Sequence, residues 1–93
     1  SIMAAYYEIL NVSSSWLIKK GINKTMANNY ITELFLSLSQ DAVNKKSQGF
    51  KKLVADSQTP KGLNMQVLKE LKRGKFYTKL IKAMDNINKR VSS

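Results

Sequence analysis

The chain contains almost none of the residues that interrupt helices. Its 93 residues include one proline and four glycines, whereas a sheet protein of this length needs turn residues between all of its strands. Between these breaks the apolar side chains recur every three or four residues, which places them along one face of an α-helix. The pattern predicts an all-α fold of about five helices, without strands, forming a single domain over residues 1–93.

The apolar spacing also predicts where each helix lies. We expect helices over about 2–20, from Asn23 or Thr25 to Lys45, from Phe50 to no further than Thr59, from Gly62 to Arg73, and from Phe76 or Tyr77 to Val91. Gly21 and Gly74 are expected to terminate the first and fourth helices, because glycine is favoured just beyond a helix end. The second helix, roughly 30 Å long, carries an apolar stripe that so small a domain can hardly cover. That stripe indicates a partner.

The residue inventory excludes several kinds of chemistry. There is no cysteine and no histidine, which removes disulfides, Cys/His metal sites, a thiol nucleophile and an imidazole base. The six carboxylates are scattered along the sequence. We therefore predict no metal site and no catalytic residue in this chain. The apolar runs are too short for a transmembrane segment, and no secretory signal pattern is present, so no membrane association is expected.

The charge balance has two interpretations. Lys and Arg total 16 against 6 Asp and Glu, a net charge of +10. Such an excess is typical of a small basic module that binds nucleic acid or another anionic partner. However, only Arg73 and Arg90 are arginines, and the chain also holds eight asparagines. A general bias of composition toward Lys and Asn would produce the same charge.

One loop has the chemistry of an anion site. Thr59-Pro60-Lys61-Gly62 precedes the fourth helix, which opens with Leu63-Asn64. A Pro-x-Gly loop at a helix start leaves backbone N–H groups free at the positive end of the helix dipole, where a carboxylate or phosphate can bind. The alternative is a capped helix start in which Thr59 or Asn64 bonds to nearby backbone.

The succession of motifs from Asp56 to Arg90 resembles a known family. A Pro-x-Gly loop, a helix, Gly74 and Phe76 separated by Lys75, and a closing helix follow one another. The C-terminal dimerisation domain of pyrroline-5-carboxylate reductase carries a T-S-P-G-G-T/A-T loop, a helix, a Gly-Phe pair and a closing helix. The resemblance extends over the whole chain, although the family's S-G-P-A opening is Ser1-Ile2-Met3-Ala4 here.

This resemblance implies a function for the parent protein. The family reduces the C=N bond of a small cyclic imine carboxylate with NADP or NAD, in cytoplasmic proline biosynthesis. Its cofactor is bound by an N-terminal Rossmann domain, which is absent from this sequence, so the fragment alone is expected to be inactive. The first two helices are expected to interlock in a homodimer. A parent that has lost its activity, and serves only in oligomerisation, is an alternative.

The resemblance also assigns substrate-binding residues. Pro60 and Gly62 match the family loop directly, and Thr59 stands where the family has Ser. The amides of Leu63 and Asn64 would face the substrate carboxylate. Asn64 replaces a Thr that hydrogen-bonds the substrate in the family, so a polar contact is expected in altered geometry. Nucleic acid is not an expected partner in this interpretation, whereas the basic-module alternative requires it.

Overall fold

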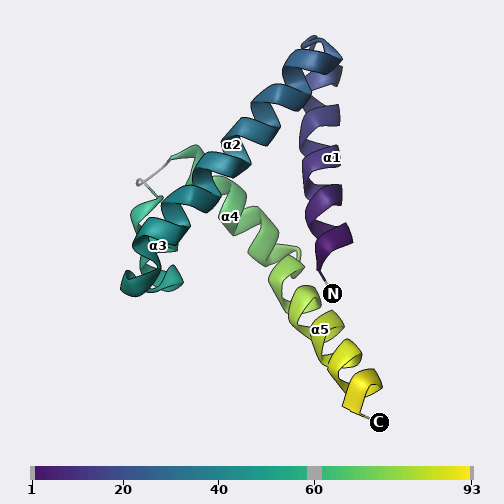
Figure 1. The fold of residues 1–93 in the computed structure, drawn as a ribbon, viewed down its shortest axis with the longest axis vertical. Coiled ribbons are helices and arrows are strands. Elements are labelled where there is room, and N and C mark those ends of the chain that lie inside the picture. Colours follow the sequence, from purple (N-terminus) through teal and green to yellow (C-terminus); the bar gives the residue numbers. More distant parts are fainter. Residues whose placement is uncertain (1, 59–61, 93) are drawn as a thin grey trace. The chain divides into compact units, whose positions relative to one another are not determined.

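The structure is a computed structural model that describes residues 2–58 and 62–92, and these residues form five α-helices and no strand (Figure 1). The helices are α1 (Met3–Lys19), α2 (Lys24–Lys45), α3 (Phe50–Asp56), α4 (Leu63–Arg73) and α5 (Phe76–Ser92), with a 3₁₀ turn, η1 (Lys46–Gln48), after α2. The all-α prediction is confirmed. The chain divides into two compact units, Ile2–Ser47 and Gln48–Ser93.

The turn between α1 and α2 is determined by local sequence. Gly21 has a φ of 105°, a left-handed conformation that glycine adopts without steric cost. The Gly21 N–H donates to the Ile18 carbonyl at 3.0 Å and the Ile22 N–H donates to the Leu17 carbonyl at 3.1 Å. These two bonds form a Schellman motif. The prediction that Gly21 terminates the first helix is therefore confirmed.

Helix α2 begins with a side-chain cap. The Asn23 Oδ1 accepts a hydrogen bond from the Met26 N–H at 2.9 Å, which satisfies one of the backbone donors that a helix start leaves without an intrahelical acceptor. From this cap α2 runs for 22 residues. It leaves the turn beside α1 and the two helices diverge along their length (Figure 1). The Tyr6 and Phe35 rings contact each other edge to face further along the pair, with centroids 6.1 Å apart.

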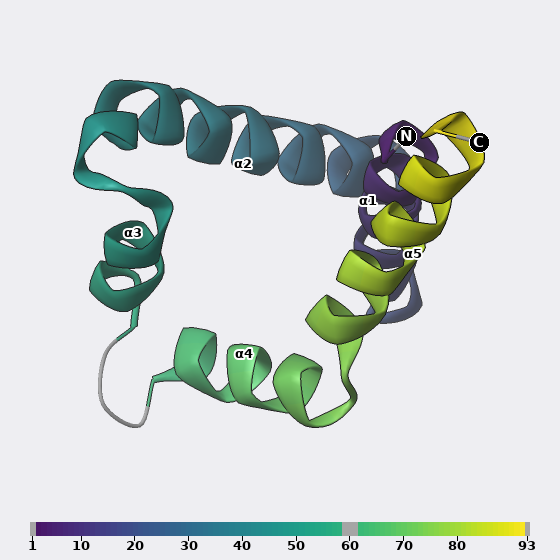
Figure 2. The ribbon, with the colours of Figure 1, turned by 90° about the horizontal axis from the view of Figure 1, so that it is seen from below.

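The second unit contains three shorter helices. Gly49 precedes α3 with a φ of 89°, so this glycine also occupies a backbone conformation that side chains disfavour. Helices α4 and α5 meet at a sharp corner (Figure 2). At that corner the prediction that Gly74 terminates α4 is confirmed. Gly74 is the last cap residue of α4 with an ordinary φ of −77°, and Lys75 takes the left-handed conformation with a φ of 61°.

Very little of this chain is buried. Among the described residues only Ala27, Ile31 and Ser14 are buried, and all three lie where α1 and α2 approach each other. Most of the large apolar side chains are exposed. None of the helices in residues 2–58 and 62–92 has the length and hydrophobicity needed to cross a bilayer.

Candidate subunit interface and ligand-binding loop

Helix α1 is apolar on more than the side that faces α2. Leu10 and Leu17 lie toward α2 and are half-buried. Val12 and Trp16 lie on another side of the helix, four residues apart, and each is 59% exposed. A helix that is apolar on most of its circumference is normally enclosed by protein. Helix α1 therefore lacks covering groups on at least one apolar side within its own unit.

Helix α2 also carries apolar side chains that its own unit does not cover, beyond its contact with α1. Its apolar stripe is covered at Ala27 and Ile31, close to the turn. Leu38, further along the same stripe, is 55% exposed, and α1 and α2 diverge with distance from their turn (Figure 1). Tyr30 is 60% exposed on a neighbouring side. Together with Val12 and Trp16, these residues define an uncovered apolar surface of the first unit.

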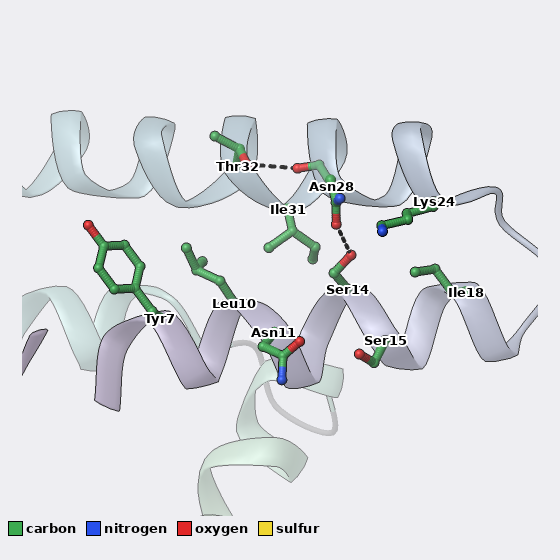
Figure 3. A pocket seen from close by; sticks show the side chains of 10 residues that line it. All are labelled: Tyr7, Leu10, Asn11, Ser14, Ser15, Ile18, Lys24, Asn28, Ile31 and Thr32. Atoms are coloured by element: carbon green, nitrogen blue, oxygen red, sulfur yellow. Dashed lines mark hydrogen bonds between the residues drawn. The ribbon is translucent and has the colours of Figure 1, made fainter. Parts of the chain in front are cut away.

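Two grooves follow the α1–α2 pair. One, of about 470 Å³, is predominantly apolar and is lined by Val12, Ser13, Trp16, Leu17, Tyr30 and Ile31. The other, of about 330 Å³, has a mixed lining and is shown in Figure 3. Exposed apolar grooves in a small helical unit are typical of surfaces that bind another protein.

The mixed groove contains the one buried polar side chain of the described residues, Ser14. Its hydroxyl donates to the Asn28 Oδ1 at 2.5 Å (Figure 3). This bond links α1 to α2 and offsets the cost of burying a hydroxyl. The sequence analysis did not single out either residue. The run of three serines, 13–15, inside an otherwise apolar segment was the available signal.

The second unit also carries uncovered apolar rows. On α4 the row contains Leu63 and Val67, which are 79% and 58% exposed. A groove of about 430 Å³ runs beside these two residues. On α5 the row includes Ile81, which is 58% exposed. Both helices also carry polar and charged residues beside these rows, among them Gln66 and Glu70 in the α4 groove.

The candidate ligand-binding loop is described only from Gly62 onward. Thr59 and Pro60 lie outside the described residues. Gly62 is the N-cap of α4 and provides no side-chain cap. Because the first amides of any α-helix have no intrahelical acceptor, the N–H groups of Leu63 and Asn64 have no acceptor within α4.

Asn64 makes a specific contact beside the loop. Its Nδ2 donates to the Ser57 carbonyl at 3.2 Å, which connects the first turn of α4 to the end of α3. This acceptor determines the orientation of the amide, because only the NH₂ group can donate to a carbonyl. The side-chain oxygen of Asn64 is consequently directed away from Ser57. Because its partner is a carbonyl at the end of α3, this bond does not cap the free N–H groups at the start of α4.

The titratable side chains of the described residues form no constellation for metal binding. No group of three or more metal-ligating side chains occurs within residues 2–58 and 62–92. The carboxylates that have partners there pair with neighbours on their own helix, as Asp56 does with the Lys52 Nζ at 2.7 Å. The chemistry available at the loop is therefore hydrogen bonding and charge attraction.

A comparison with known families gives one finding that bears on these surfaces. The family model described as "Pyrroline-5-carboxylate reductase dimerisation" matches residues 1–93. No curated protein and no solved structure shows significant similarity to the chain. The family match supports the dimerisation interpretation and does not favour the basic nucleic-acid-binding module.

Proposed function

Since this chain belongs to the pyrroline-5-carboxylate reductase dimerisation family, we propose that it forms a homodimer through the uncovered apolar sides of α1 and α2. The two units are then parts of one domain. The observation that carries the proposal is the exposure of Val12 and Trp16 on a helix that is also apolar toward α2. A two-fold partner is the commonest way to cover such surfaces in a homo-oligomer.

The energy available from this association is substantial. Full burial of a large apolar side chain contributes roughly 1.5–3 kcal/mol. Val12, Trp16, Tyr30 and Leu38 are each more than half exposed. Covering these four would contribute roughly 3.5–7 kcal/mol per chain before the cost of association. An interlocked pair of chains would therefore be held by contacts that salt does not weaken.

The dimer would serve an NAD(P)-dependent reductase. The proposed parent reduces the C=N bond of a small cyclic imine carboxylate in the cytoplasm. The residues here do not fit a dinucleotide, because the glycines occur singly at helix ends and no strand–glycine–helix unit is present in the described residues. A separate nicotinamide-binding domain of the parent would hold the cofactor, and the nicotinamide supplies the hydride when it is bound.

The part played by this chain would be to position the substrate. The amides of Leu63 and Asn64 would donate to the substrate carboxylate, since the helix start is electropositive. Thr59, Pro60 and Gly62 would shape the loop around it. Asn64 already donates its NH₂ group to Ser57. Its Oδ1 would therefore meet the substrate as an acceptor, which suits a protonated ring nitrogen better than a second carboxylate oxygen.

Light scattering after size exclusion tests the dimer. The chain of 10.5 kDa is expected to elute as a species of twice that mass at both low and high salt. Val12→Asp should produce a monomer, because an unpaired carboxylate in an apolar interface costs several kcal/mol. Gln40→Asp is the matched control, since Gln40 is exposed on the polar side of α2. A monomeric wild-type chain, or equal dissociation of both variants, would contradict the proposal.

Titration followed by ¹⁵N NMR tests the substrate-binding residues. L-proline, the reduced form of the expected ring, should shift the amide resonances of Leu63 and Asn64. Prolinamide lacks the carboxylate and should leave them unchanged. Asn23 and Met26 at the start of α2 provide an internal control, because that helix start is already capped by a side chain. Equal shifts of these amide resonances with L-proline and prolinamide would contradict the proposed carboxylate site.

A further inference from the structure

The apolar groove of the first unit carries no charge, although the chain as a whole is rich in charge. Charged residues make up 24% of the sequence, and the net charge is +10. The mixed groove of the first unit includes Lys24 in its lining, and the groove beside α4 includes Glu70. The apolar groove is the one of these three without a charged residue; its lining is Val12, Ser13, Trp16, Leu17, Tyr30 and Ile31.

The neutrality of this groove indicates which kind of partner it fits. An anionic partner is attracted to the surfaces that carry the lysines, and a neutral groove offers it nothing. Two copies of a chain with a net charge of +10 repel each other, and the repulsion is weakest where neither copy carries a charge. The centres of protein interfaces are likewise poor in charge and rich in Trp and Tyr. The apolar groove therefore fits a second copy of this chain better than an anionic molecule.

Trp16 is the largest side chain beside the groove and the only tryptophan of the sequence. It is 59% exposed, although tryptophan is highly buried on average in folded proteins. At that exposure its side chain leaves roughly 150 Å² in contact with water. A two-fold interface joins the same surface patch of both copies. A large exposed side chain next to an apolar groove meets this condition, because each copy supplies both the side chain and the groove.

Lys20 holds the indole of Trp16 before any partner binds. The Lys20 Nζ lies over the Trp16 ring, 5.8 Å from the ring centroid, which is a cation–π contact across one helical turn. A side chain that is already restrained loses less conformational entropy when a partner covers it. The cation–π attraction also becomes stronger when water is removed from around it. Both effects favour Trp16 as a contact residue.

We propose that Trp16 is the reciprocal anchor of the homodimer: its indole packs into the partner's apolar groove, and the partner's Trp16 packs into the groove described here. That the partner is a second copy rests on the homodimer proposed above. The groove of about 470 Å³ has walls from both helices of the first unit, with Leu17 from α1 and Tyr30 from α2. Aromatic anchors seated in apolar pockets at the centre of an interface contribute most of the binding energy.

The fluorescence of Trp16 tests this arrangement in the wild-type chain, because no other tryptophan contributes to the emission. The chain is diluted stepwise, and light scattering gives its mass at each concentration. The emission and its quenching by acrylamide are recorded on the same samples, with excitation that tyrosine does not absorb. We expect a protected indole in the dimer. Dilution should shift the emission to the red and increase quenching several-fold, at the concentration where the mass falls by half.

Two substitutions on α1 test the anchor independently. Trp16→Ala should weaken the dimer about thirtyfold or more, which is the loss typical of an interface anchor. Tyr7→Ala is the matched control, because Tyr7 is also 59% exposed on α1 but lines the mixed groove instead of the apolar one. This control should weaken the dimer less than about threefold. Circular dichroism shows whether each variant retains its helices, and the dilution of the wild-type chain depends on neither variant.

Salt tests whether the contact lies between neutral surfaces. Ions screen the repulsion between the two basic copies, so raising the salt concentration from about 50 mM to about 500 mM should tighten the dimer several-fold. Weaker association at high salt would contradict a neutral contact and overturn the proposal.

The outcomes separate this proposal from the homodimer on which it rests. A dimer in which acrylamide quenches Trp16 as strongly as in the monomer would overturn the anchor and leave the homodimer intact. Equal weakening by Trp16→Ala and Tyr7→Ala would do the same. A chain that stays monomeric at every concentration would contradict the homodimer itself, and the anchor with it.

Discussion

Replacement of Lys75 by glycine should stabilise the corner between α4 and α5. Lys75 has a φ of 61°, and this left-handed conformation costs a residue with a β-carbon roughly 1–2 kcal/mol. Both backbone groups of Lys75 are engaged there. Its N–H donates to the Lys72 carbonyl at 3.0 Å, and its carbonyl accepts from the Lys79 N–H at 2.9 Å. The bonds hold the strained conformation, so the strain is present in the folded chain.

The net gain in stability from K75G is smaller than the strain energy that the substitution relieves. Glycine loses about 0.5–1 kcal/mol more backbone entropy on folding than a residue with a side chain. The difference leaves K75G more stable by about 0.5–1 kcal/mol per chain. Two controls remove the same charge. K75A retains the β-carbon and should gain little, whereas K79G places glycine inside α5 and should cost about 1 kcal/mol.

Thermal unfolding by circular dichroism measures these differences. All variants are compared at one chain concentration, because the melting temperature of an oligomer depends on concentration. K75G should raise Tm by about 2–6 °C relative to wild type, and K79G should lower it by a similar amount. A lower Tm for K75G, or the same gain in K75A, would refute the reasoning from the backbone conformation.

Two further contacts of the first unit can be tested by substitution. Ser14→Ala should destabilise the chain by about 1 kcal/mol, because the Asn28 Oδ1 loses its donor. Adding Asn28→Leu to Ser14→Ala should recover part of that loss. If chemical denaturation showed that the losses of stability from the two single substitutions add up in the double variant, Ser14 and Asn28 would not be a coupled pair. Asn23→Ala should also cost about 1 kcal/mol through loss of the bond to Met26. The control, Asn29→Ala on the exposed part of α2, should be nearly neutral. If Asn23→Ala and Asn29→Ala lowered the denaturation midpoint equally, Asn23 would not stabilise α2 as its cap.

The candidate site could be predicted in part. The sequence indicated a helix start with available amides after the Pro-x-Gly loop, because the signals for a helix start are local. It could not show that Asn64 bonds to Ser57, since that contact depends on how the end of α3 approaches α4. Gly74 was expected to terminate α4 on the general preference for glycine. Gly74 does cap α4 after Arg73, but the left-handed conformation falls one residue later, at Lys75.

The sequence by itself determined the helices. Apolar spacing, the Gly21 turn and the Asn23 cap are interactions between residues a few positions apart, so they can be read without a tertiary partner. Only the tertiary structure decided which of the serines at positions 13–15 is buried against α2, because burial depends on the approach of a distant segment. It also showed how little of α1 and α2 the chain covers by itself. Hydrophobic periodicity identifies the side of a helix that avoids water, and packing determines whether anything covers that side.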